Sequence, residues 1–290
     1  SVTYNPAFLK IFDEIVSNSV DEHRRNPRKL NKLDVLVNPE KGAILVKDNG
    51  GIVVDKHPEH DEWIPELIFS NLKAGSNFDD SEERLVAGTN GVGSTLTNIF
   101  SKAFRIRTSD GKKAFSQKFA NNMTSKDTAE VSKAKSKKGY TEIAFMPDFE
   151  RFEMKTVDED HMMMLQKRVI DLAACNPKLK VTFNKEDYSF KSFEDYCKLY
   201  SEDVIYVEGP RWKIGIASSH GSMQHVSFVN SVETSDGGTH VDYIANQIVT
   251  HLRALIKKKH KIDVRPQEIK NHIFLFVQAD IVNPIFSSFL

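Results

Sequence analysis

Apolar residues recur along residues 6–25 at the three- and four-residue spacing of a helix that buries one side. At 100° per residue, the opposite side carries Glu14, Asn18 and Asp21 at spacings of four and three residues. The predicted helix ends before Pro27. The inward side is formed by Phe8, Phe12, Ile15, Val16, Ser19 and Val20.

Strand and helix periods alternate through the rest of the first 200 residues. Residues 74–90 are polar, glycine-punctuated and aperiodic, which predicts a mobile loop. Residues 121–138 are rich in Lys, Ser, Thr and Asn, and we expect a solvated excursion without a function. Strands are predicted at 33–37, 43–46, 104–107, 114–119, 141–146 and 180–183, and helices at 63–72, 91–100, 159–174 and 192–200.

The pattern changes near Tyr200, where a second and smaller α/β unit is predicted. Its strands are expected at 212–217, 225–229 and 273–279, with a long amphipathic helix at 242–256. The chain is therefore predicted to be an α+β protein with domains at residues 1–200 and 201–290.

Composition excludes several classes of protein. The 290 residues include 40 basic and 40 acidic side chains, so only a local basic patch could attract nucleic acid. Cys175 and Cys197 fit neither a metal-ligand spacing nor a disulfide framework, and we expect reduced thiols. No apolar run is long enough to span a membrane, and residues 1–10 are not a signal peptide. A cytoplasmic protein is expected.

Candidate chemistry begins on the polar side of the first helix. Acidic residues on a solvated helix face are common and need no function. However, Asn18 lies one turn from Glu14, so its oxygen could bind Mg²⁺ while Glu14 holds a water molecule. Phosphoryl transfer needs such a positioned water, a metal bridging phosphates, and donors for the developing charge.

A second segment, Asp48-Asn-Gly-Gly-Ile52, follows a predicted strand. These residues favour a tight turn for backbone reasons alone. They could also form a base site, in which Asp48 accepts from the amine of adenine, Gly50 admits the base, and Ile52 packs on it. Thr141 begins a later strand and could support Asp48 through water, although threonine is a common strand residue.

A third segment, Gly88-Thr-Asn-Gly-Val-Gly-Ser-Thr95, opens a predicted helix. Glycine-rich turns at a helix N-terminus present backbone N–H groups to phosphates. No glycine here is followed by Lys-Ser/Thr, and the full G-x-G-x-x-G pattern is absent. These absences exclude a Walker P-loop and a dinucleotide-binding fingerprint.

Taken in order, four motifs resemble those of the GHKL ATPases: residues 12–22, Asp48-Asn-Gly, Gly88-x-Asn-Gly-x-Gly93, and Gly139-x-Thr141. Further runs are similar to type IIA DNA topoisomerases in particular, with bacteriophage large subunits the most similar. The resemblance covers nearly the whole chain. The runs that carry it are residues 64–69, 76–80, 91–100, 145–148, 228–231, 237–241, 270–274 and 283–286.

The resemblance implies a two-layer α/β sandwich, the GHKL or Bergerat ATPase domain, followed by a smaller α/β transducer. It implies ATP hydrolysis that drives DNA strand passage, Mg²⁺, double-stranded DNA, further topoisomerase domains or subunits, and homodimerisation when ATP binds. Glu14 is then the general base, Asn18 the metal ligand, and Asp48 with Thr141 the adenine site. Nucleotide contacts are also expected from Gly50, Ile52, Ser76, Asn77, Asn90, Gly91, Val92, Gly93, Ser94 and Thr95.

The chain departs from the family pattern at several positions. Where the family has Arg or Lys between two glycines, Gly50 is followed directly by Gly51, and Val53 stands in place of Pro, which leaves the usual partner of Glu22 unidentified. Thr95 stands where eukaryotic members often have Lys. The family continues with Gln-Thr-Lys where this sequence reads Ser287-Ser-Phe-Leu290, so no lysine is assigned to the γ-phosphate. The N-terminal arm that family members exchange between protomers is also not found.

Three alternative functions remain open from the sequence. A mismatch-repair ATPase or an ATP-driven chaperone would share the first domain, but should lack the run at residues 237–241. A nucleotide-gated module without hydrolysis would not need Glu14. The basic run at residues 257–261 could instead indicate a DNA-binding protein, although a charge run at a helix end is more often a solvated terminus.

Overall fold

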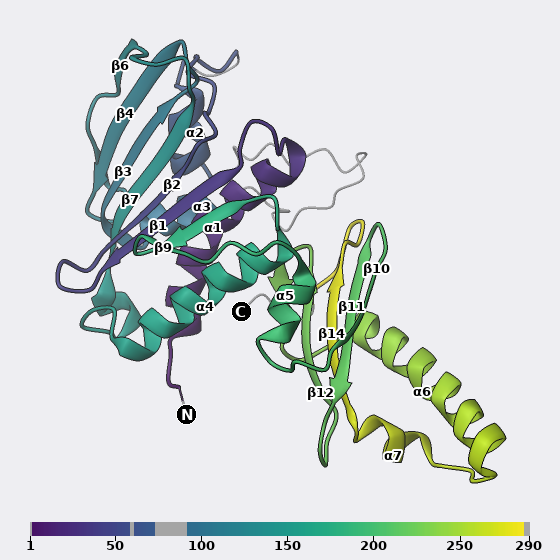
Figure 1. Ribbon diagram of the computed structural model, residues 1–290. Coiled ribbons are helices and arrows are strands. Elements are labelled where there is room, and N and C mark those ends of the chain that lie inside the picture. The colour runs from purple at the N-terminus through teal and green to yellow at the C-terminus, as the bar shows by residue number, and fades with distance from the viewer. Residues whose placement is uncertain (1, 59–60, 73–91, 287–290) are drawn as a thin grey trace. The chain divides into compact units, whose positions relative to one another are not determined.

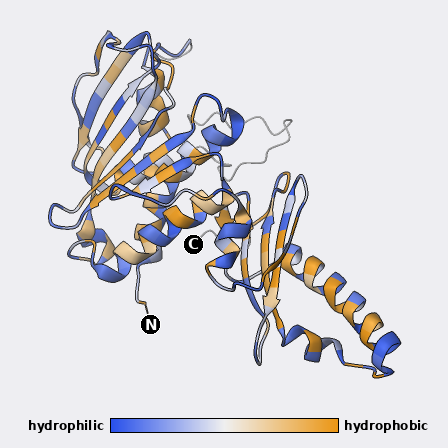
Figure 2. Cartoon of the chain, viewed as in Figure 1, coloured by the Kyte–Doolittle hydropathy of each residue, from blue (hydrophilic) through white to orange (hydrophobic). Residues whose placement is uncertain are grey.

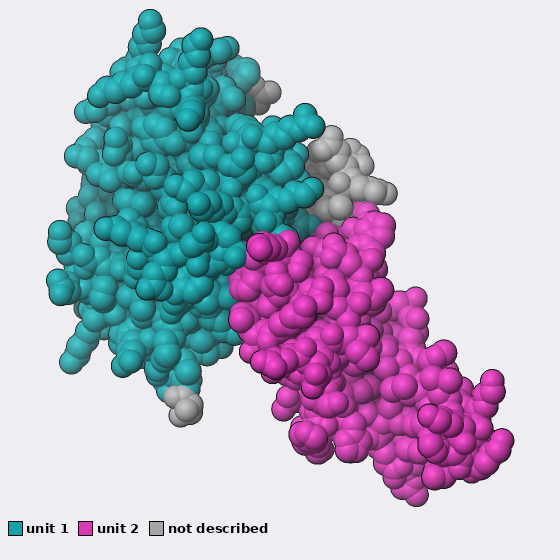
Figure 3. Space-filling model, in the orientation of Figure 1, with its two compact units in different colours: residues 1–189, 286–290 teal, residues 190–285 magenta. Residues whose placement is uncertain are grey.

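The computed structural model describes residues 2–58, 61–72 and 92–286. The chain forms two compact units, Ser1–Ser189 with Phe286–Leu290, and Phe190–Ile285 (Figure 3). The loop predicted at 74–90 lies outside the described residues. Each unit has its own sheet, and we describe each by itself.

The larger unit is an α/β sandwich whose helices cover one face of a mixed sheet (Figure 1). The strand order is β5-β4-β3-β7-β2-β1-β8-β9, with β6 paired to β4. Most neighbours are antiparallel, and β1 pairs with β8 in parallel. The strands are β1 (Lys32–Asn38), β2 (Ala43–Asp48), β3 (Ser101–Ser109), β4 (Lys113–Ala120), β5 (Ser125–Lys126), β6 (Glu130–Lys133), β7 (Tyr140–Pro147), β8 (Lys180–Phe183) and β9 (Glu186–Asp187).

The helical layer contains α1 (Pro6–Arg25), α2 (Ile64–Ser70), α3 (Gly93–Ile99) and α4 (Glu159–Cys175), with a 3-10 turn at Phe149–Phe152. Hydrophobic and hydrophilic residues are interspersed along the strands (Figure 2), and Phe104 of β3 packs on Phe69 of α2. No helix among the described residues is long and apolar enough to cross a membrane.

Helix α1 begins and ends at the predicted residues. Pro6 occupies the first turn, where its missing N–H costs nothing, and the Asn5 side chain accepts from the Phe8 N–H at 3.0 Å. The prediction of a fully wet opposite side is wrong for Asp21, which is only 5% exposed. Ile11 is also buried, because α1 is packed on more than one side of its wheel.

Residues 121–138 are more ordered than the predicted excursion. They contain β5 and β6, both antiparallel to β4. Their polar sequence carries no strand period, so pairing with the exposed edge of β4 decides the structure here. The predicted solvated excursion is exposed over most of its side chains, but it also contains two short strands that were not predicted.

The smaller unit has a sheet of order β10-β11-β14-β12-β13. Strands β12 and β14 are parallel, and α6 forms the crossover between them. The unit begins at Phe190, ten residues before the predicted boundary, because α5 packs aromatic side chains against this sheet. Its elements are α5 (Phe193–Lys198), β10 (Ile205–Glu208), β11 (Trp212–Ser218), β12 (Gln224–Val229), β13 (Val232–Glu233), α6 (Thr239–His260), α7 (Pro266–Lys270) and β14 (Ile273–Ala279).

Candidate nucleotide site

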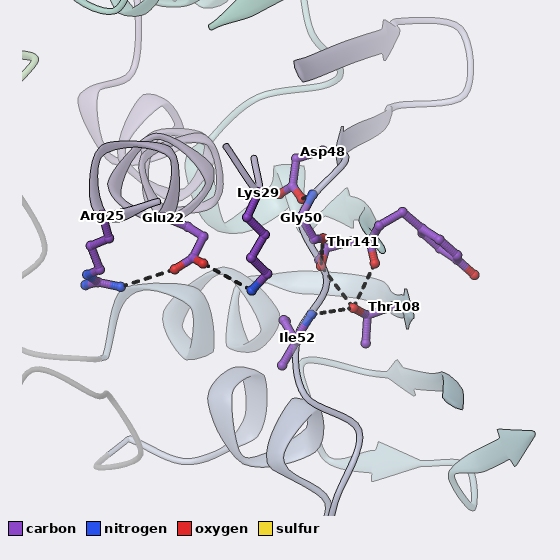
Figure 4. Close-up of polar contacts among 9 residues, drawn as sticks. Glu22, Arg25, Lys29, Asp48, Gly50, Ile52, Thr108 and Thr141 are labelled. Carbon is purple, nitrogen blue, oxygen red and sulfur yellow. Dashed lines mark hydrogen bonds and ion pairs between the residues drawn. The ribbon is translucent and has the colours of Figure 1, made fainter. Parts of the chain in front are cut away.

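Asp48 is the last residue of β2, and its side chain is buried beneath α1 (Figure 4). Ser19 of α1 donates its hydroxyl to Asp48 Oδ2 at 2.7 Å. The Gly50 N–H donates to Asp48 Oδ1 at 2.9 Å, which closes the turn after the strand. Asp48 is therefore fixed by two donors, one from the helix and one from its own turn.

Burial raises the pKa of Asp48 to about 7, although the hydrogen bonds from Ser19 and Gly50 oppose that shift. Without a ligand, this carboxyl group exchanges a proton near neutral pH. A perturbed acid at the end of a strand indicates a site rather than a simple turn residue. Donor groups from a ligand would favour the charged form.

Thr141 lies directly opposite Asp48 in the pairing of β2 with β7. Its hydroxyl donates to the Gly50 carbonyl at 3.0 Å and lies 2.9 Å from the hydroxyl of Thr108. Thr108 in turn accepts from the Ile52 N–H at 3.1 Å (Figure 4). No sequence motif indicates Thr108, because its contact with Thr141 depends on the pairing of β3 with β7.

The glycines of this corner are required by close backbone approach. A Cβ at Gly51 would overlap the Ser109 carbonyl oxygen, and one at Gly139 would lie 2.9 Å from the Gly51 nitrogen. A Cβ at Gly50 would meet Leu30 at 2.8 Å. Three stretches of backbone thus pack without side chains between them. This packing leaves no space for a side chain at position 51.

Glu22 has a cationic partner despite the glycine at position 51. Lys29 Nζ lies 3.2 Å from Glu22 Oε1, and Arg25 Nη1 lies 3.8 Å from Oε2 (Figure 4). Both partners come from the end of α1 or from the residues just after it. All three side chains are partly exposed, so these ion pairs add little stability. They do hold Glu22 at the edge of the site.

Glu14 lies one and a half turns before Ser19 on α1 and faces the start of α3. A Cβ added to Gly93 would overlap the Glu14 carboxylate, so the two residues are in direct contact. Thr97 of α3 donates to the Ile11 carbonyl at 2.8 Å and fixes the two helices together. Lys10 Nζ lies 2.8 Å from Glu14 Oε1. The Glu14 side chain remains partly exposed.

The hydroxyls of Ser94 and Thr95 donate to backbone carbonyls of the neighbouring segment. Ser94 donates to the Ile68 carbonyl at 3.2 Å, and Thr95 donates to the Asn71 carbonyl at 3.1 Å. Both side chains are buried. Phosphate contacts from Val92 to Thr95 would therefore use the backbone N–H groups of the first turn of α3, which have no acceptor within the helix.

Helix α1 links the two halves of the site. Glu14 and Ser19 are five residues apart, a rise of about 7.5 Å along the axis. The contact of α1 with the buried acid at the end of β2 and its contact with the N-terminus of α3 are therefore about 7.5 Å apart along the helix axis. Asn18 lies between these contacts, and its side chain is exposed.

A magnesium ion bound with a nucleotide needs only one or two protein oxygens, since phosphates and water complete its octahedron. Asn18 fits that requirement as an exposed amide oxygen on the same helix as Glu14. Within residues 2–58, 61–72 and 92–286, no group of three or more His, Cys, Asp or Glu side chains could hold a metal ion. Four expected contacts, Ser76, Asn77, Asn90 and Gly91, lie outside the described residues.

Comparison with known proteins agrees with this geometry. A DNA topoisomerase 2 of Pisum sativum is 41% identical over 304 residues, which covers 99% of this chain and 21% of that protein. The ATPase region of Saccharomyces cerevisiae topoisomerase II is 36% identical, with a TM-score of 0.89 over 97% of this chain and 75% of that structure. The chain belongs to the ATPase region of the type IIA DNA topoisomerases.

Other comparisons support this family assignment. The ATPase and transducer domains of Balamuthia mandrillaris topoisomerase II are 36% identical, with a TM-score of 0.92 over 99% of this chain and 76% of that structure. The DNA gyrase B family profile matches residues 185–288. Gyrase B of Thermus thermophilus, at 22% identity and a TM-score of 0.69, shares the fold. The predicted fold, a GHKL domain followed by a transducer, is confirmed.

The family assignment excludes a mismatch-repair ATPase or a chaperone as the closest description of this chain. The chain spans about a fifth of the length of the topoisomerase 2 sequences that it matches. The activity of a whole topoisomerase is therefore a proposal for this protein.

Proposed function

We propose that this chain binds and hydrolyses ATP, and that hydrolysis drives DNA strand passage in a type IIA topoisomerase. The observation that carries the proposal is the buried Asp48 carboxyl, fixed by Ser19 and Gly50 and placed opposite Thr141. The related structure from Saccharomyces cerevisiae is an ATPase region, and the one from Balamuthia mandrillaris consists of ATPase and transducer domains, which supports the assignment of the nucleotide.

In this proposal Asp48 accepts a hydrogen bond from the exocyclic amine of adenine. Thr141 supports the same edge of the base through water, and Ile52 packs on the ring. The bare backbone at Gly50 leaves room for that approach. Purines without an amine at this position would add no donor to the buried carboxylate, so the site should prefer adenine.

We assign Glu14 as the base that accepts a proton from the attacking water. Its contact with Gly93 puts this carboxylate at the first turn of α3, where phosphates would bind. Asn18, with Glu14 nearby, would hold Mg²⁺, which supplies charge neutralisation for the phosphates when bound. Lys10 keeps Glu14 oriented in the nucleotide-free chain.

Asp48→Asn tests the nucleotide site. The asparagine amide would present a donor to the adenine amine, so we expect ATP affinity to fall at least about 100-fold, on the scale of losing a charged hydrogen bond and leaving its donor unpaired. Isothermal titration calorimetry measures the affinity, and circular dichroism checks the fold. Asp127→Asn, at an exposed residue of the same unit, is the control. Unchanged affinity in Asp48→Asn would refute the adenine role.

Several finer parts of the proposal concern the whole enzyme. We propose homodimerisation through the ATPase region when ATP binds, cooperation with the remaining topoisomerase domains or subunits, and double-stranded DNA as the substrate. The similarity to bacteriophage large subunits and a cytoplasmic location, in the host if the source is viral, stay predictions. A nucleotide-gated module without hydrolysis is the competing function, and it would retain ATP binding without turnover.

A further inference from the structure

The neutral chain has an uneven distribution of charge. Residues 102–138 contain 11 of the 40 basic residues and 3 of the 40 acidic ones, which leaves 29 basic and 37 acidic residues elsewhere. The segment covers β3 to β6 and their connections. Its exposed lysines at one end of the sheet form what we call the lysine cluster, which consists of Lys112, Lys113, Lys133, Lys135, Lys137 and Lys138.

Two connections come together to form this cluster. The Ala134 N–H donates to the Lys112 carbonyl at 2.8 Å. Gly111, with a positive φ of 88°, lies so close to the Lys137 carbonyl that a Cβ would overlap it. Lys113 and Lys133 are direct partners across β4 and β6. Backbone hydrogen bonds and strand pairing thus hold the lysines of the cluster close together.

Asp110, which precedes the cluster in the sequence, is already engaged by the backbone. Asp110 Oδ1 accepts from the N–H groups of Lys112 and Lys113, each at 2.8 Å, and Oδ2 accepts from Val54 at 3.1 Å. These bonds fix the turn between β3 and β4. In the part of the chain that the structure describes, Lys113 is the one member of the cluster with an ion-pair partner, Asp55 at 2.7 Å.

This arrangement works against stability in the isolated chain. Like charges directly opposite on paired strands repel one another, as Lys113 and Lys133 must. Solubility alone does not require so many positive charges in one segment. The rest of the chain has more acidic than basic residues. A partner with many negative charges would relieve the repulsion, which makes the cluster a candidate binding surface.

We propose that the lysine cluster binds the phosphate backbone of double-stranded DNA without regard to sequence. The residues between the lysines are small: Gly111, Ser132, Ala134 and Ser136. Lysine and serine are suited to phosphate contact, whereas protein interfaces depend on buried Trp, Tyr and Arg anchors, which this surface lacks. The choice of DNA among polyanions rests on the proposed function.

The test compares two triple variants that lose the same charge. Lys133→Gln/Lys135→Gln/Lys137→Gln removes half of the cluster, and Lys155→Gln/Lys178→Gln/Lys191→Gln removes three exposed lysines elsewhere. Fluorescence anisotropy measures binding of the full chain to two labelled duplexes of equal length and unrelated sequence. The salt concentration is varied to give the slope of log K against log salt.

We expect the cluster variant to bind both duplexes at least about tenfold more weakly, with the salt slope reduced by about 1 for each lysine in contact. The control variant should bind like the wild-type chain. Equal loss in both variants would show an effect of net charge only, and unchanged binding in the cluster variant would also overturn the proposal. Weaker binding to polyglutamate with unchanged DNA binding would identify an acidic protein partner instead.

Nucleotide binding separates this inference from the proposed function. The cluster variant should retain wild-type ATP affinity by calorimetry, because none of its three lysines belongs to the site around Asp48. If the wild-type chain binds no nucleotide while duplex binding still depends on the cluster, the proposed ATPase fails and the DNA surface stands. If ATP binds and the cluster makes no difference to DNA, the reverse holds.

Discussion

At the scale of single residues, Glu14 illustrates how position determines chemistry. The helix pattern alone makes it one of several acids on the polar side of α1. In the structure it contacts Gly93 and pairs with Lys10, while its neighbour Asp21 is buried. Only one of these acids therefore meets the first turn of α3 at a glycine.

Glu14→Gln should separate binding from hydrolysis. Glutamine keeps the shape of the side chain but cannot take a proton from water, so we expect ATP affinity close to wild type and turnover reduced by at least about 100-fold. A coupled phosphate-release assay measures turnover, and Glu40→Gln, in the exposed turn between β1 and β2, serves as the control. Wild-type turnover in Glu14→Gln would remove the residue from the mechanism.

Sequence reasoning identified the site residues that a family motif contains, but not their supports. Asp48 and Thr141 were both named, and the pairing of β2 with β7 brings them together. Ser19 was counted as an inward helix residue, although its hydroxyl holds Asp48. Thr108 was missed. The contacts of Ser19 and Thr108 join different elements, and the hydrophobic periodicity of a single helix or strand does not predict them.

At the scale of elements, α3 depends on its neighbours more than on its own sequence. Its seven residues are too few for a stable isolated helix. Side-chain bonds from Ser94, Thr95 and Asn98 to carbonyls of α2 and the residue after it fix one side, and Thr97 fixes the other side to α1. The position of the first turn of α3 is thereby set from two directions.

Gly93→Ala should disturb this position. The new methyl group would overlap the Glu14 carboxylate, so either the side chain or the helix must move. We expect hydrolysis to fall roughly 100-fold, the scale of a misplacement by about 1 Å. Stability should change little, because the end of the partly exposed Glu14 side chain can turn aside. Turnover and thermal melting measure the two effects. Gly209→Ala is the control because its Cβ would meet only an ordinary contact at 3.7 Å; if the two variants behave alike, the contact with Glu14 has no importance.

The longer elements could be predicted from the sequence, and the short ones could not. The bounds of α1, β8 and β14 match the prediction, because apolar periods persist through them. By contrast, β5, β9 and β13 have two residues each and exist only because a neighbouring strand offers unpaired backbone. The five-residue helix α7 begins at a proline after a polar stretch, and it too was missed.

At the scale of the whole molecule, the zero net charge is the sum of a positively charged segment and a negatively charged remainder. A basic β3–β6 segment sits within an otherwise acidic chain. The zero total charge excluded a uniform attraction to nucleic acid. It could not reveal a positively charged surface formed where two connections between strands meet. The local excess was visible in the sequence, but its concentration at one end of the sheet required the strand pairing.

A non-hydrolysable ATP analogue should convert the chain from monomer to dimer. In the proposed function, nucleotide binding completes the surface through which two copies associate, and the absence of hydrolysis holds them there. Multi-angle light scattering measures the mass with and without a saturating concentration of analogue, and Asp48→Asn provides a chain that cannot respond. A monomer at saturation in the wild-type chain would contradict dimerisation by this chain.

The buried carboxyl of Asp48 also makes ATP binding depend on the pH of the solution. With a pKa of about 7, it is protonated in about half of the nucleotide-free molecules at that pH. An amine that donates to it favours the charged form, so each binding event releases about half a proton, and acidity opposes binding. The heat of ATP binding should therefore depend on the buffer that takes up the proton, in proportion to its ionisation enthalpy.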